Sequence, residues 1–476
     1  MKMYDVIIIG GGVVGSAIAH ELSRYKLEIA LLEKETELAF GVSKSNSGII
    51  HPGTQNPPGS LKGKLCVRGN KLTRKIALEL GIDFKEVGEL IVAFSESDME
   101  HLKQIKSDAE KLGVRGLKIV NKAWLTKHEP NLSDKVVSAL YAPTAGIISP
   151  YRFVYDLSEN AANNGVKIFT DTEVKNIKTA GKNNFELITQ NSVFKTSYVV
   201  NAAGLYADEV SAMIGIDDFK ISPRKGEEYI LDKKLEHISN HLIFPLPEEH
   251  TKGILIIKTA DGNPMVGPTA KEQEDKEGHS TSDEGIEEVF SAVKKMMPKI
   301  DKKHVITSFA GLRPIAGKDF IIRHEDKVPG FVNVAGIQSP GLTAAPAIAE
   351  MVARILKDNG LKLKKKPHFK KHRRKTTHLF ALPLKKLEKL IKIDPEYGDI
   401  VCRCEMVSVK EIRDAIKRGA KTLDGVKFRT RAQAGRCHGG FCTCRIMKIL
   451  SKELNIDITT VTKRGRGSEI VIGELR

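Results

Sequence analysis

The sequence predicts a mixed α/β fold that carries a second, antiparallel sheet and ends in a small, helix-rich domain. Three observations lead to this fold class. The chain opens on an apolar run that enters a glycine cluster and then a helix-forming segment. Later apolar runs end in further glycine turns. All cysteines except Cys66 lie at or after Cys402, beyond a strongly basic stretch.

The segment up to Glu33 contains a complete βαβ opening. The apolar run Val6 to Ile9 suits a central parallel strand, because both faces of such a strand are covered. Residues 10–15 form the motif GxGxxG, and a segment with apolar residues at helical spacing follows. A second strand, Glu28 to Leu32, ends at Glu33, at the spacing from the glycines that an acidic ribose partner usually has. This order is that of a Rossmann-like dinucleotide site.

Each residue of this opening has a distinct role towards a dinucleotide. Gly10 permits the tight turn, Gly12 lets the backbone approach the pyrophosphate, and Gly15 lets helix and strand pack closely. The helix N-terminus offers N–H groups to phosphate, and Glu33 can accept hydrogen bonds from the ribose hydroxyls. A glycine turn without a ligand is the alternative, and the motif alone does not distinguish FAD from NAD.

Two later strands are predicted to end in glycine turns as well. The strand Tyr198 to Val200 leads into Asn201-Ala202-Ala203-Gly204, and the strand Phe331 to Val334 leads into Ala335-Gly336. Gly341-Leu342-Thr343 then opens a helix that runs to Leu356. The chain has no second GxGxxG motif, so we expect no separate nicotinamide site within it.

Five stretches resemble the FAD-dependent oxidoreductases of the D-amino-acid oxidase and glycerol-3-phosphate dehydrogenase superfamily. They are YDVIIIGGGVVG, NSGIIHPG, NAAGLYAD, FAGLRP and GIQSPGLTAAPAIAE, and the resemblance covers residues 1 to about 357. It implies an FAD-binding Rossmann-like domain with an interleaved antiparallel substrate domain at about 80–150 and 205–310. Strands at Glu227 to Leu231 and Gly253 to Ile257, with a turn at Asp261-Gly262-Asn263, would belong to that substrate domain.

The resemblance also implies which residues hold the cofactor. The helix that starts near Gly341 would aim its N-terminus at the flavin pyrimidine ring and stabilise negative charge there. The expected FAD-binding residues are Gly10, Gly12, Gly15, Glu33, Ser47, Ala203, Gly204, Gly336, Gly341, Leu342 and Thr343.

Four residues are candidates for the catalytic site. Arg313, in FAGLRP, matches the arginine that in this superfamily holds the anionic group of the substrate. Lys258 is a candidate second cation, with solvent exposure as the alternative. His51 is the first candidate for the general base, because imidazole titrates near neutral pH; a structural hydrogen bond to the cofactor is the alternative. Glu228 is a rival base, because Lys225-Gly226-Glu227-Glu228 stands where aerobic relatives have KGSH.

The C-terminal cysteines point to a metal centre. Cys402 and Cys404 are followed, well further along the chain, by Cys437 and Cys442, and intracellular chains seldom keep disulfides. The CxC and CxxxxC spacing, with DPEYGDIVCRCE and GRCHGGFC, resembles the bacterioferritin-associated-ferredoxin type of 2Fe-2S domain. It also resembles the C-terminal extension of the anaerobic glycerol-3-phosphate dehydrogenase large subunit. Zinc and unmetallated thiols are the alternatives, and Cys444 could replace Cys442 as a ligand.

Two smaller features accompany this cluster. The basic residues Lys427, Arg429 and Arg431 either hold the cluster loop, meet an acidic partner or lie in a solvated loop. The sixth cysteine, Cys66, is expected to be a small core residue.

The formal charge of +17 is confined to the C-terminal quarter of the chain. Residues 1–358 contain 46 basic and 47 acidic residues, residues 359–386 contain 11 basic and no acidic ones, and residues 397–476 contain 17 and 9. We therefore expect a flavin domain at 1–358, a basic linker at 359–396 that resists packing, and a 2Fe-2S domain at 397–476. The linker could also meet an anionic membrane or an acidic protein. Aromatic residues are sparse there, so we expect no nucleic-acid partner.

The combination predicts an FAD-dependent dehydrogenase of a small anionic 2-hydroxy substrate. The fused cysteine domain favours glycerol 3-phosphate, whereas NSGIIHPG and PGSLKGKLCVRGN also resemble L-2-hydroxyglutarate dehydrogenases. An amine or imino-acid dehydrogenase subunit and a non-catalytic electron-transfer subunit are further alternatives. Electrons would leave through the 2Fe-2S centre to a flavoprotein or a membrane-associated subunit, because no nicotinamide site is expected.

The location expected from the sequence is the cytoplasm. No apolar run reaches the 18 or more residues that a membrane span needs. A strand begins at Tyr4, which leaves no room for a signal peptide. Peripheral association with the inner face of the membrane is the alternative.

Overall fold

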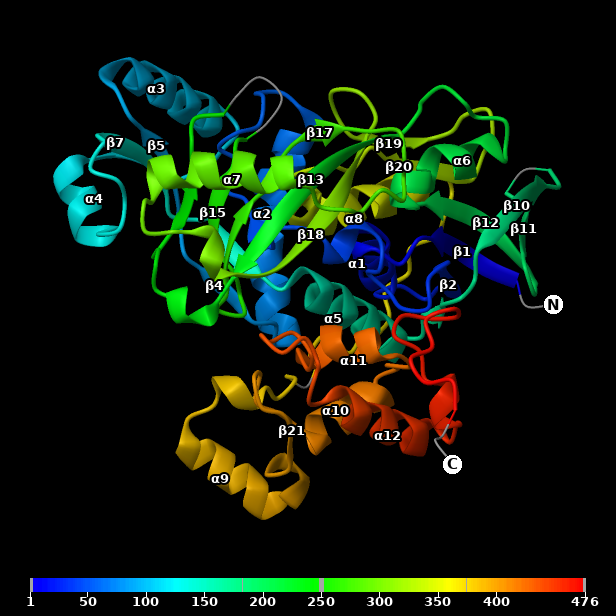
Figure 1. Cartoon of the computed structure of the whole chain (residues 1–476). Helices are drawn as coiled ribbons and strands as arrows, with labels where there is room; N and C mark the ends of the chain where they lie inside the picture. Colours follow the sequence, from blue (N-terminus) through cyan, green and yellow to red (C-terminus); the bar gives the residue numbers. More distant parts are fainter. Residues whose placement is uncertain (1–2, 182, 248–251, 374, 474–476) are drawn as a thin grey trace. The chain divides into compact units, whose positions relative to one another are not determined.

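The computed structural model describes residues 3–181, 183–247, 252–373 and 375–473 (Figure 1). The chain divides into two compact units. The first contains Met1–Leu32, Ala39–Ile168 and Val174–His372, and the second contains Glu33–Leu38, Phe169–Glu173 and Arg373–Arg476. Each unit has its own hydrophobic core.

A largely parallel sheet forms the Rossmann-like part of the first unit. β1 (Met3–Ile9) pairs in parallel with β2 (Ile29–Leu32) and with β12 (Val193–Asn201), and β12 pairs in parallel with β20 (Phe331–Ala335). The predicted parallel strands are therefore confirmed. The remaining strands of this sheet lie at its margins: β9 (Lys167–Phe169), β10 (Val174–Thr179), β11 (Phe185–Thr189) and β19 (Ile321–His324).

Helices cover this sheet and contact one another closely. The first, α1 (Val13–Leu22), follows the glycine motif and packs against α8 (Gly341–Asp358), which follows β20. Apolar residues of β1 and α1 are almost fully buried, as a strand and helix in the centre of an α/β layer require. The other helices of this layer are α2 (Leu61–Leu80), α5 (Pro150–Asn163) and α6 (Ala207–Ala212).

The second sheet is mostly antiparallel and comes from chain segments on both sides of β12, as expected for an interleaved substrate domain. Its strand order is β17-β13-β16-β15-β14-β5-β7-β6, with β18 paired to β13. The strands are β5 (Glu89–Ala93), β6 (Lys118–Asn121), β7 (Ser138–Ala142), β13 (Ser222–Leu231), β14 (Leu242–Phe244), β15 (Leu255–Lys258), β16 (Pro264–Gly267), β17 (Lys271–Glu272) and β18 (Val305–Ile315). Its helices are α3 (Glu96–Lys111), α4 (Lys122–His128) and α7 (Asp283–Met296).

The expected strands of this sheet are present with shifted bounds. The predicted strand 227–231 is the second half of β13. The predicted strand 253–257 begins slightly later, at Leu255. Lys258 pairs with Pro264 in antiparallel register, so the predicted turn at Asp261-Gly262-Asn263 does connect two strands of one hairpin.

A small three-stranded sheet holds the loop that contains His51. It consists of β3 (Ile49–Ile50), β8 (Gly146–Ile148) and β4 (Phe84–Glu86), with β8 between the other two. Ile49 and Ile50 pair with Ile147 and Gly146. Because β3 is so short and ends directly before His51, this pairing sets the direction in which the chain enters that residue.

The basic segment after α8 packs along part of its length, which differs from the free arm that its charge predicts. The backbone of Lys364 and Lys365 pairs with the segment around Tyr25. The backbone of Lys370 bonds to the side chains of Asn160 and Asn164. The boundary between the two units lies after His372, inside the predicted linker. Backbone hydrogen bonds can anchor such a segment while its charged side chains stay in water.

The second unit is small and helical. A two-stranded sheet, β21 (Ile400–Cys402) and β22 (Val407–Ser408), carries the first cysteine pair. Its helices are α9 (Leu384–Ile393), α10 (Val409–Lys417), α11 (Leu423–Thr430) and α12 (Thr443–Leu454). The core of this unit contains Ile412, Val426 and Ile446, one from each of the last three helices, together with Cys402 and Cys442.

Within the described residues, no helix is both long enough and apolar enough to cross a membrane.

Candidate functional site

The glycine motif forms a cradle that other residues could not line. Gly10 has a φ of 105°, which side chains rarely adopt, and a Cβ there would lie 2.4 Å from the carbonyl oxygen of Ala202. A Cβ at Gly15 would lie 1.9 Å from the carbonyl oxygen of Gly10. These glycines let β1, α1 and the turn after β12 approach closely, as a dinucleotide site requires.

The N-terminus of α1 can still bind an anion, although the hydroxyl of Ser43 accepts a hydrogen bond of 2.8 Å from the backbone N–H of Val13. Gly12 precedes the helix and provides no side-chain cap. The hydroxyl of Ser16, in the first turn, is buried and has no hydrogen-bond partner among the described residues. A phosphate at this helix N-terminus could accept hydrogen bonds from both the backbone and the serine. Glu33 directly follows β2, whose last residue pairs with Ile9. The residues of this βαβ unit therefore fit the pyrophosphate and ribose of a bound dinucleotide.

The other predicted turns lie at the carboxyl ends of the same parallel strands. Ala203 and Gly204 follow β12, and Gly336 follows β20. Asn201 and Asn333, near the ends of these two strands, are joined by a side-chain hydrogen bond of 2.8 Å. Ligands of parallel sheets bind at this edge. The predicted glycine turns therefore lie together at the edge where a dinucleotide could bind.

The first turn of α8 holds the loop of His51. The hydroxyl of Thr343 accepts a hydrogen bond of 2.9 Å from the backbone N–H of His51. Asn70, on α2, donates to the backbone carbonyl of His51 at 3.0 Å. Gly341, Leu342 and Thr343 thus begin α8 beside the candidate base, and the Sγ of Cys66 lies 3.6 Å from the same carbonyl that Asn70 contacts. Cys66 is fully buried, as expected.

A second group joins Ser47, Glu228 and Arg313. Ser47 donates a hydrogen bond of 2.6 Å to one carboxylate oxygen of Glu228. The other oxygen is buried and has no hydrogen-bond partner among the described residues. Burial raises the pKa of Glu228 to about 7, although the bond from Ser47 and the charge of Arg313 oppose this shift. A buried carboxyl that titrates near neutral pH is typical of functional sites.

The strand pair β13 and β18 positions Arg313. Arg313 lies opposite Arg224 in the antiparallel register, and its guanidinium donates two hydrogen bonds of 3.3 Å to the carbonyl of Thr269. A Cβ at Gly226 would lie 2.5 Å from a terminal nitrogen of Arg313. Glycine at position 226 therefore makes the space in which the guanidinium lies. These two bonds to Thr269 leave other donors of the guanidinium available for an anion.

Lys252 is a cation of this site that the sequence analysis did not single out. Its charge lowers the pKa of His51, and the charge of Arg313 in turn lowers the pKa of Lys252. The predicted second cation, Lys258, is half-buried at the end of β15. The signal that could have identified Lys252 is its position just before a strand expected to face the pocket.

Glu89 is a second residue that the sequence analysis missed. It begins β5, is 1% exposed, and accepts a hydrogen bond from the hydroxyl of Thr54. Burial raises the pKa of Glu89 to about 7, and the charge of Lys252 opposes this shift. Burial lowers the pKa of Lys252, and the charges of Cys66 and Glu89 oppose that shift. The sequence signal that could have identified Glu89 is its position as an acidic residue at the start of the apolar run that forms β5.

Burial also lowers the pKa of His51 well below its usual range, and the charge of Lys252 lowers it further. His51 is therefore neutral near pH 7 and can accept a proton. Its ring lies edge-on to Phe244, with 6.1 Å between the ring centroids. His51, Lys252 and Arg313 are thus linked by their electrostatic interactions, and Glu228 joins them through Arg313.

The four predicted cysteine ligands form two pairs in the C-terminal unit. Cys442 donates a hydrogen bond to Cys402, and the sulfur atoms of Cys404 and Cys437 are 3.6 Å apart. The bond from Cys442 lowers the pKa of Cys402 to about 6. Two pairs of cysteines match a cluster in which each of two irons takes two protein sulfurs.

Backbone groups around the cysteines also suit sulfur ligands. Backbone N–H groups of Glu405 and Gln433 donate to Cys402, and those of Gly439 and Phe441 donate to Cys437. Such hydrogen bonds tune the reduction potential of iron–sulfur clusters. A Cβ at Gly435 would lie 2.3 Å from the Cβ of Cys404, so the two ligand loops can approach only with glycine there. The donor set therefore fits a 2Fe-2S cluster.

The structure distinguishes Cys444 from the four paired cysteines. Cys442 is buried beside Cys402, whereas Cys444 is exposed on α12. Across the described residues, no group of three or more His, Cys, Asp or Glu side chains has the geometry for a single metal ion. The pairs Cys402–Cys442 and Cys404–Cys437 therefore favour Cys442 over Cys444.

The basic residues near the cysteines make internal ion pairs. Arg431 pairs with Glu405 at 2.7 Å, and both are buried. Arg429 pairs with Glu37 at 2.7 Å, also buried. Burial lowers the pKa of Lys427, although the charge of Asp424 opposes this shift. These contacts agree with a role in holding the cluster loop and leave little of Arg429 or Arg431 exposed for an acidic partner.

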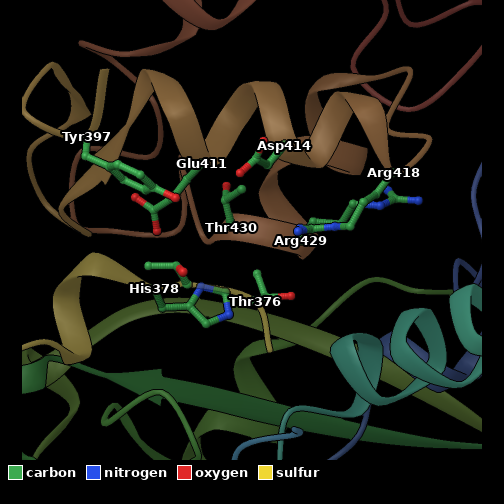
Figure 2. Close-up of a pocket in the computed structure, with 9 residues that line it drawn as sticks. Thr376, His378, Tyr397, Glu411, Asp414, Arg418, Arg429 and Thr430 are labelled. Carbon is green, nitrogen blue, oxygen red and sulfur yellow. The ribbon is translucent and has the colours of Figure 1, made fainter. Parts of the chain in front are cut away.

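The C-terminal unit also contains a small polar pocket (Figure 2). Glu411 in its wall accepts hydrogen bonds from Ser408 and Leu379. Burial raises the pKa of Glu411 to about 7. Because Glu411 caps α10 with Ser408, and Arg429 is paired with Glu37, these charged groups of the pocket serve the packing of this unit. The lining residues are Thr376, Thr377, His378, Tyr397, Glu411, Asp414, Arg418, Arg429 and Thr430.

Comparison with known proteins identifies both parts of the chain. Residues 5–355 match the family described as FAD dependent oxidoreductase. The chain belongs to this family. Residues 400–452 match the BFD-like 2Fe-2S binding domain. The expected FAD and 2Fe-2S cofactors are confirmed by these matches, and the zinc alternative loses its support.

Individual relatives of this FAD-dependent oxidoreductase span different parts of it. A glycerol 3-phosphate dehydrogenase from Caloramator mitchellensis is 42% identical over 99% of this chain and 98% of the relative. The FAD-bound structure of L-alpha-glycerophosphate oxidase from Mycoplasma pneumoniae is 35% identical with a TM-score of 0.74, over 78% of this chain and 98% of that one. A mitochondrial L-2-hydroxyglutarate dehydrogenase from Caenorhabditis briggsae is 32% identical over 64% of this chain and 72% of the relative.

Proposed function

We propose that this chain oxidises glycerol 3-phosphate to dihydroxyacetone phosphate and passes the electrons through its 2Fe-2S centre to a partner protein. The observation that carries the proposal is the 42% identity to a glycerol 3-phosphate dehydrogenase along nearly the full length of both chains. That match includes the cysteine domain, whereas the L-2-hydroxyglutarate dehydrogenase match covers 64% of this chain. L-2-hydroxyglutarate and amines are the alternative substrates, and the comparisons support them less than glycerol 3-phosphate.

The proposed substrate carries a phosphate dianion next to a secondary alcohol. Arg313 would bind the phosphate through its free guanidinium donors, and Lys252 would add a second positive charge. Lys258 is retained as a further cation at the end of β15. Two cations suit a dianion better than they suit the single charge of an amino-acid carboxylate. The charge of this pocket therefore favours a doubly charged hydroxy substrate, glycerol 3-phosphate or L-2-hydroxyglutarate, over an amino acid.

His51 is proposed as the general base. Oxidation of a secondary alcohol to a ketone removes two electrons and two protons, and the hydroxyl proton needs an acceptor close to the reacting carbon. Neutral His51 can take it, and the bonds from Thr343 and Asn70 to its backbone hold it in place. Bound FAD would accept the hydride from C2. Glu228 would hold Ser47 and provide a negative charge near Arg313.

The function predicts a specific response to substrate. Under anaerobic conditions, glycerol 3-phosphate should bleach the flavin absorbance of the purified chain on the timescale of a single turnover. L-2-hydroxyglutarate and L-proline at the same concentration should bleach it far more slowly. Bleaching by L-2-hydroxyglutarate alone would replace the proposed substrate, and the absence of bleaching by any of the three would favour the non-catalytic electron-transfer alternative.

The identity of the base leads to a second prediction. His51→Asn should slow anaerobic flavin reduction by roughly 10²–10⁴-fold at all pH values, because this is the usual contribution of a general base. Since the pKa of Glu228 is raised to about 7, its carboxylate form appears as the pH rises through that value. Flavin reduction by the wild type should therefore rise across this range, and Glu228→Gln should remove that rise. Stopped-flow measurement of flavin reduction from pH 6 to 9 distinguishes the loss at all pH values expected for His51→Asn from the altered pH dependence expected for Glu228→Gln.

The opposite pattern would reassign the base. If His51→Asn keeps the wild-type rate of flavin reduction while Glu228→Gln loses two orders of magnitude, Glu228 is the base and His51 has a structural role. Flavin content and far-ultraviolet circular dichroism of both variants serve as controls for folding.

The partner and the location are proposed on less direct grounds. The 2Fe-2S domain supports electron transfer to another protein. A bound cluster would take electrons one at a time. The proposed acceptor is a flavoprotein or a membrane-associated subunit, and the proposed location is the cytoplasm, with peripheral contact to the inner face of the membrane. No nucleic-acid role is proposed, because aromatic residues that could stack on bases are sparse in the basic part of the chain.

A further inference from the structure

Helix α9 has an amphipathic sequence, and none of its residues is buried against the other described residues. Its residues, LKKLEKLIKI, begin after Pro383 and end at Ile393. In a helix of 3.6 residues per turn, Leu384, Leu387 and Ile391 fall on one face. The lysines of the helix fall outside this face. The helix therefore has an apolar side and a strongly basic side.

The apolar side of α9 remains open to solvent. No residue of α9 is buried, and Leu384 is 81% exposed. Leu387 and Ile391 are only partly covered. Ile393, at the end of the helix, is 78% exposed but falls on the side of the lysines. Figure 1 shows α9 at the margin of the C-terminal unit, connected to the rest by the segments at its two ends. By contrast, α10 of the same unit buries its apolar residues in the core.

An apolar helical face with Leu384 exposed and Leu387 and Ile391 only partly covered is unusual in a globular unit that otherwise has a well-formed core. Isolated helices as short as α9 are marginal in water, so this helix gains little from its own backbone hydrogen bonds. A contiguous exposed apolar face of this kind marks an interaction surface. The apolar face of α9 is therefore expected to be covered by another surface.

The charge of α9 identifies the chemistry of that surface. The helix carries Lys385, Lys386, Lys389 and Lys392 against a single acidic residue, Glu388. All four lysines are exposed, and residues 359–383, which lead into α9, contain 9 further basic residues and no acidic one. A partner must therefore offer both an apolar layer and dense negative charge beside it. The surface of a bilayer that contains anionic phospholipid offers both.

We propose that α9 binds in the plane of such a bilayer, with Leu384, Leu387 and Ile391 among the acyl chains and the lysines at the headgroups. The helix spans about 15 Å, half of a hydrocarbon core, so it lies in the interface and does not cross the bilayer. Lysine stems can reach from such a depth to lipid phosphates. This proposal goes beyond the dehydrogenase activity and does not depend on the substrate.

The test is the partition of the purified full chain into large unilamellar vesicles, measured by flotation. The chain should bind vesicles of phosphatidylcholine with one-quarter phosphatidylglycerol and should not bind vesicles of phosphatidylcholine alone. Binding should fall steeply as the salt concentration rises from about 0.05 to about 0.5 M. The electrostatic screening length is about 10 Å at 0.1 M and shortens towards about 3 Å at 1 M, so the lysines lose their attraction to the anionic headgroups.

Two double variants of α9 separate the contributions of charge and of apolar surface. Lys385→Gln with Lys389→Gln should lower the partition coefficient about 25-fold, since each basic residue near an anionic surface contributes about fivefold. Leu384→Gln with Leu387→Gln should lower it at least about tenfold, because both side chains lose an apolar environment.

Matched controls come from α2, which lies in the first unit together with the glycine motif. Lys71→Gln with Lys75→Gln removes two exposed lysines at the same spacing, and Leu78→Gln removes a leucine that is 85% exposed. Neither control should change vesicle binding. Because the α9 positions are unburied, all variants should keep the wild-type flavin spectrum and anaerobic flavin reduction, so a failure here is distinct from a failure of the proposed activity.

Three results would overturn the proposal. One is the absence of binding to anionic vesicles. Another is an α9 variant that binds as well as the wild type. The third is a change of oligomeric state without lipid: if the wild type elutes as a dimer and Leu384→Gln with Leu387→Gln elutes as a monomer, the apolar face covers a second copy of this chain.

Discussion

Cys437→Ser should abolish electron transfer to an external protein acceptor while leaving reduction of the flavin by glycerol 3-phosphate intact. Cys437 pairs with Cys404 at 3.6 Å, and serine is a much poorer ligand for iron than a thiolate. The variant should lose the paramagnetic signal of the reduced cluster and its iron. Because the glycine motif expected to bind FAD lies in the first unit and Cys437 in the second, the flavin absorbance and its bleaching by substrate should persist.

Cys444→Ser provides the matched control for this experiment. Cys444 is exposed and lies outside the two cysteine pairs, so its variant should keep the cluster and the full rate of transfer. If Cys444→Ser loses the cluster and Cys437→Ser keeps it, the ligand set proposed here is wrong. If both variants keep transfer to the acceptor, the electrons do not pass through the cluster.

Arg313→Ala should lose about 30-fold to several thousand-fold in affinity for the substrate, because removal of one partner from a desolvated charge pair costs about 2–5 kcal/mol. The flavin spectrum should remain, since Arg313 bonds to the carbonyl of Thr269 within the second sheet and not to the glycine cradle. Substrate affinity is measured from the concentration dependence of anaerobic flavin reduction.

The control is Arg323→Ala, on β19. Arg323 pairs with Asp218 and Glu325 at the surface of the first unit, and its loss removes the same charge without touching the Arg313 group. Its affinity for substrate should match that of the wild type. Equal affinities for Arg313→Ala and the wild type would remove Arg313 from the substrate site, and Lys252→Ala would become the next variant to measure.

Much of the cofactor site follows from the sequence because its chemistry depends on neighbouring residues. A strand, a glycine turn and a helix in direct succession can form only a narrow set of structures, and the φ of 105° at Gly10 is one that glycine adopts readily. The cysteine spacing is likewise local within the CxC and CxxxxC motifs. These features, and the matches of residues 5–355 and 400–452 to their families, agree with one another.

The candidate catalytic residues were less accessible to sequence reasoning, because they come from distant parts of the chain. Lys252 and Glu89 lie far apart in the sequence, and the pairing of β5 with β14 and of β14 with β15 brings their segments together. Their pKa shifts arise from burial, which no local pattern records. For the same reason, the sequence analysis proposed Lys258 and did not single out Lys252.

For the basic segment, too, composition predicted one property and the fold decided others. Composition alone predicted a linker at 359–396, since cations without a balancing anion repel one another. Composition does not reveal that Asn160 and Asn164 bond to the backbone of Lys370, or that the apolar side of α9 finds no core. Residue type and spacing predicted a dinucleotide site and a cysteine-ligated centre, and the resemblance to known families specified FAD and 2Fe-2S as the cofactors of this protein. Its pocket, its cysteine pairing and its exposed helix were decided by contacts between residues far apart in the chain, because burial and charge neighbours exist only once the chain has folded.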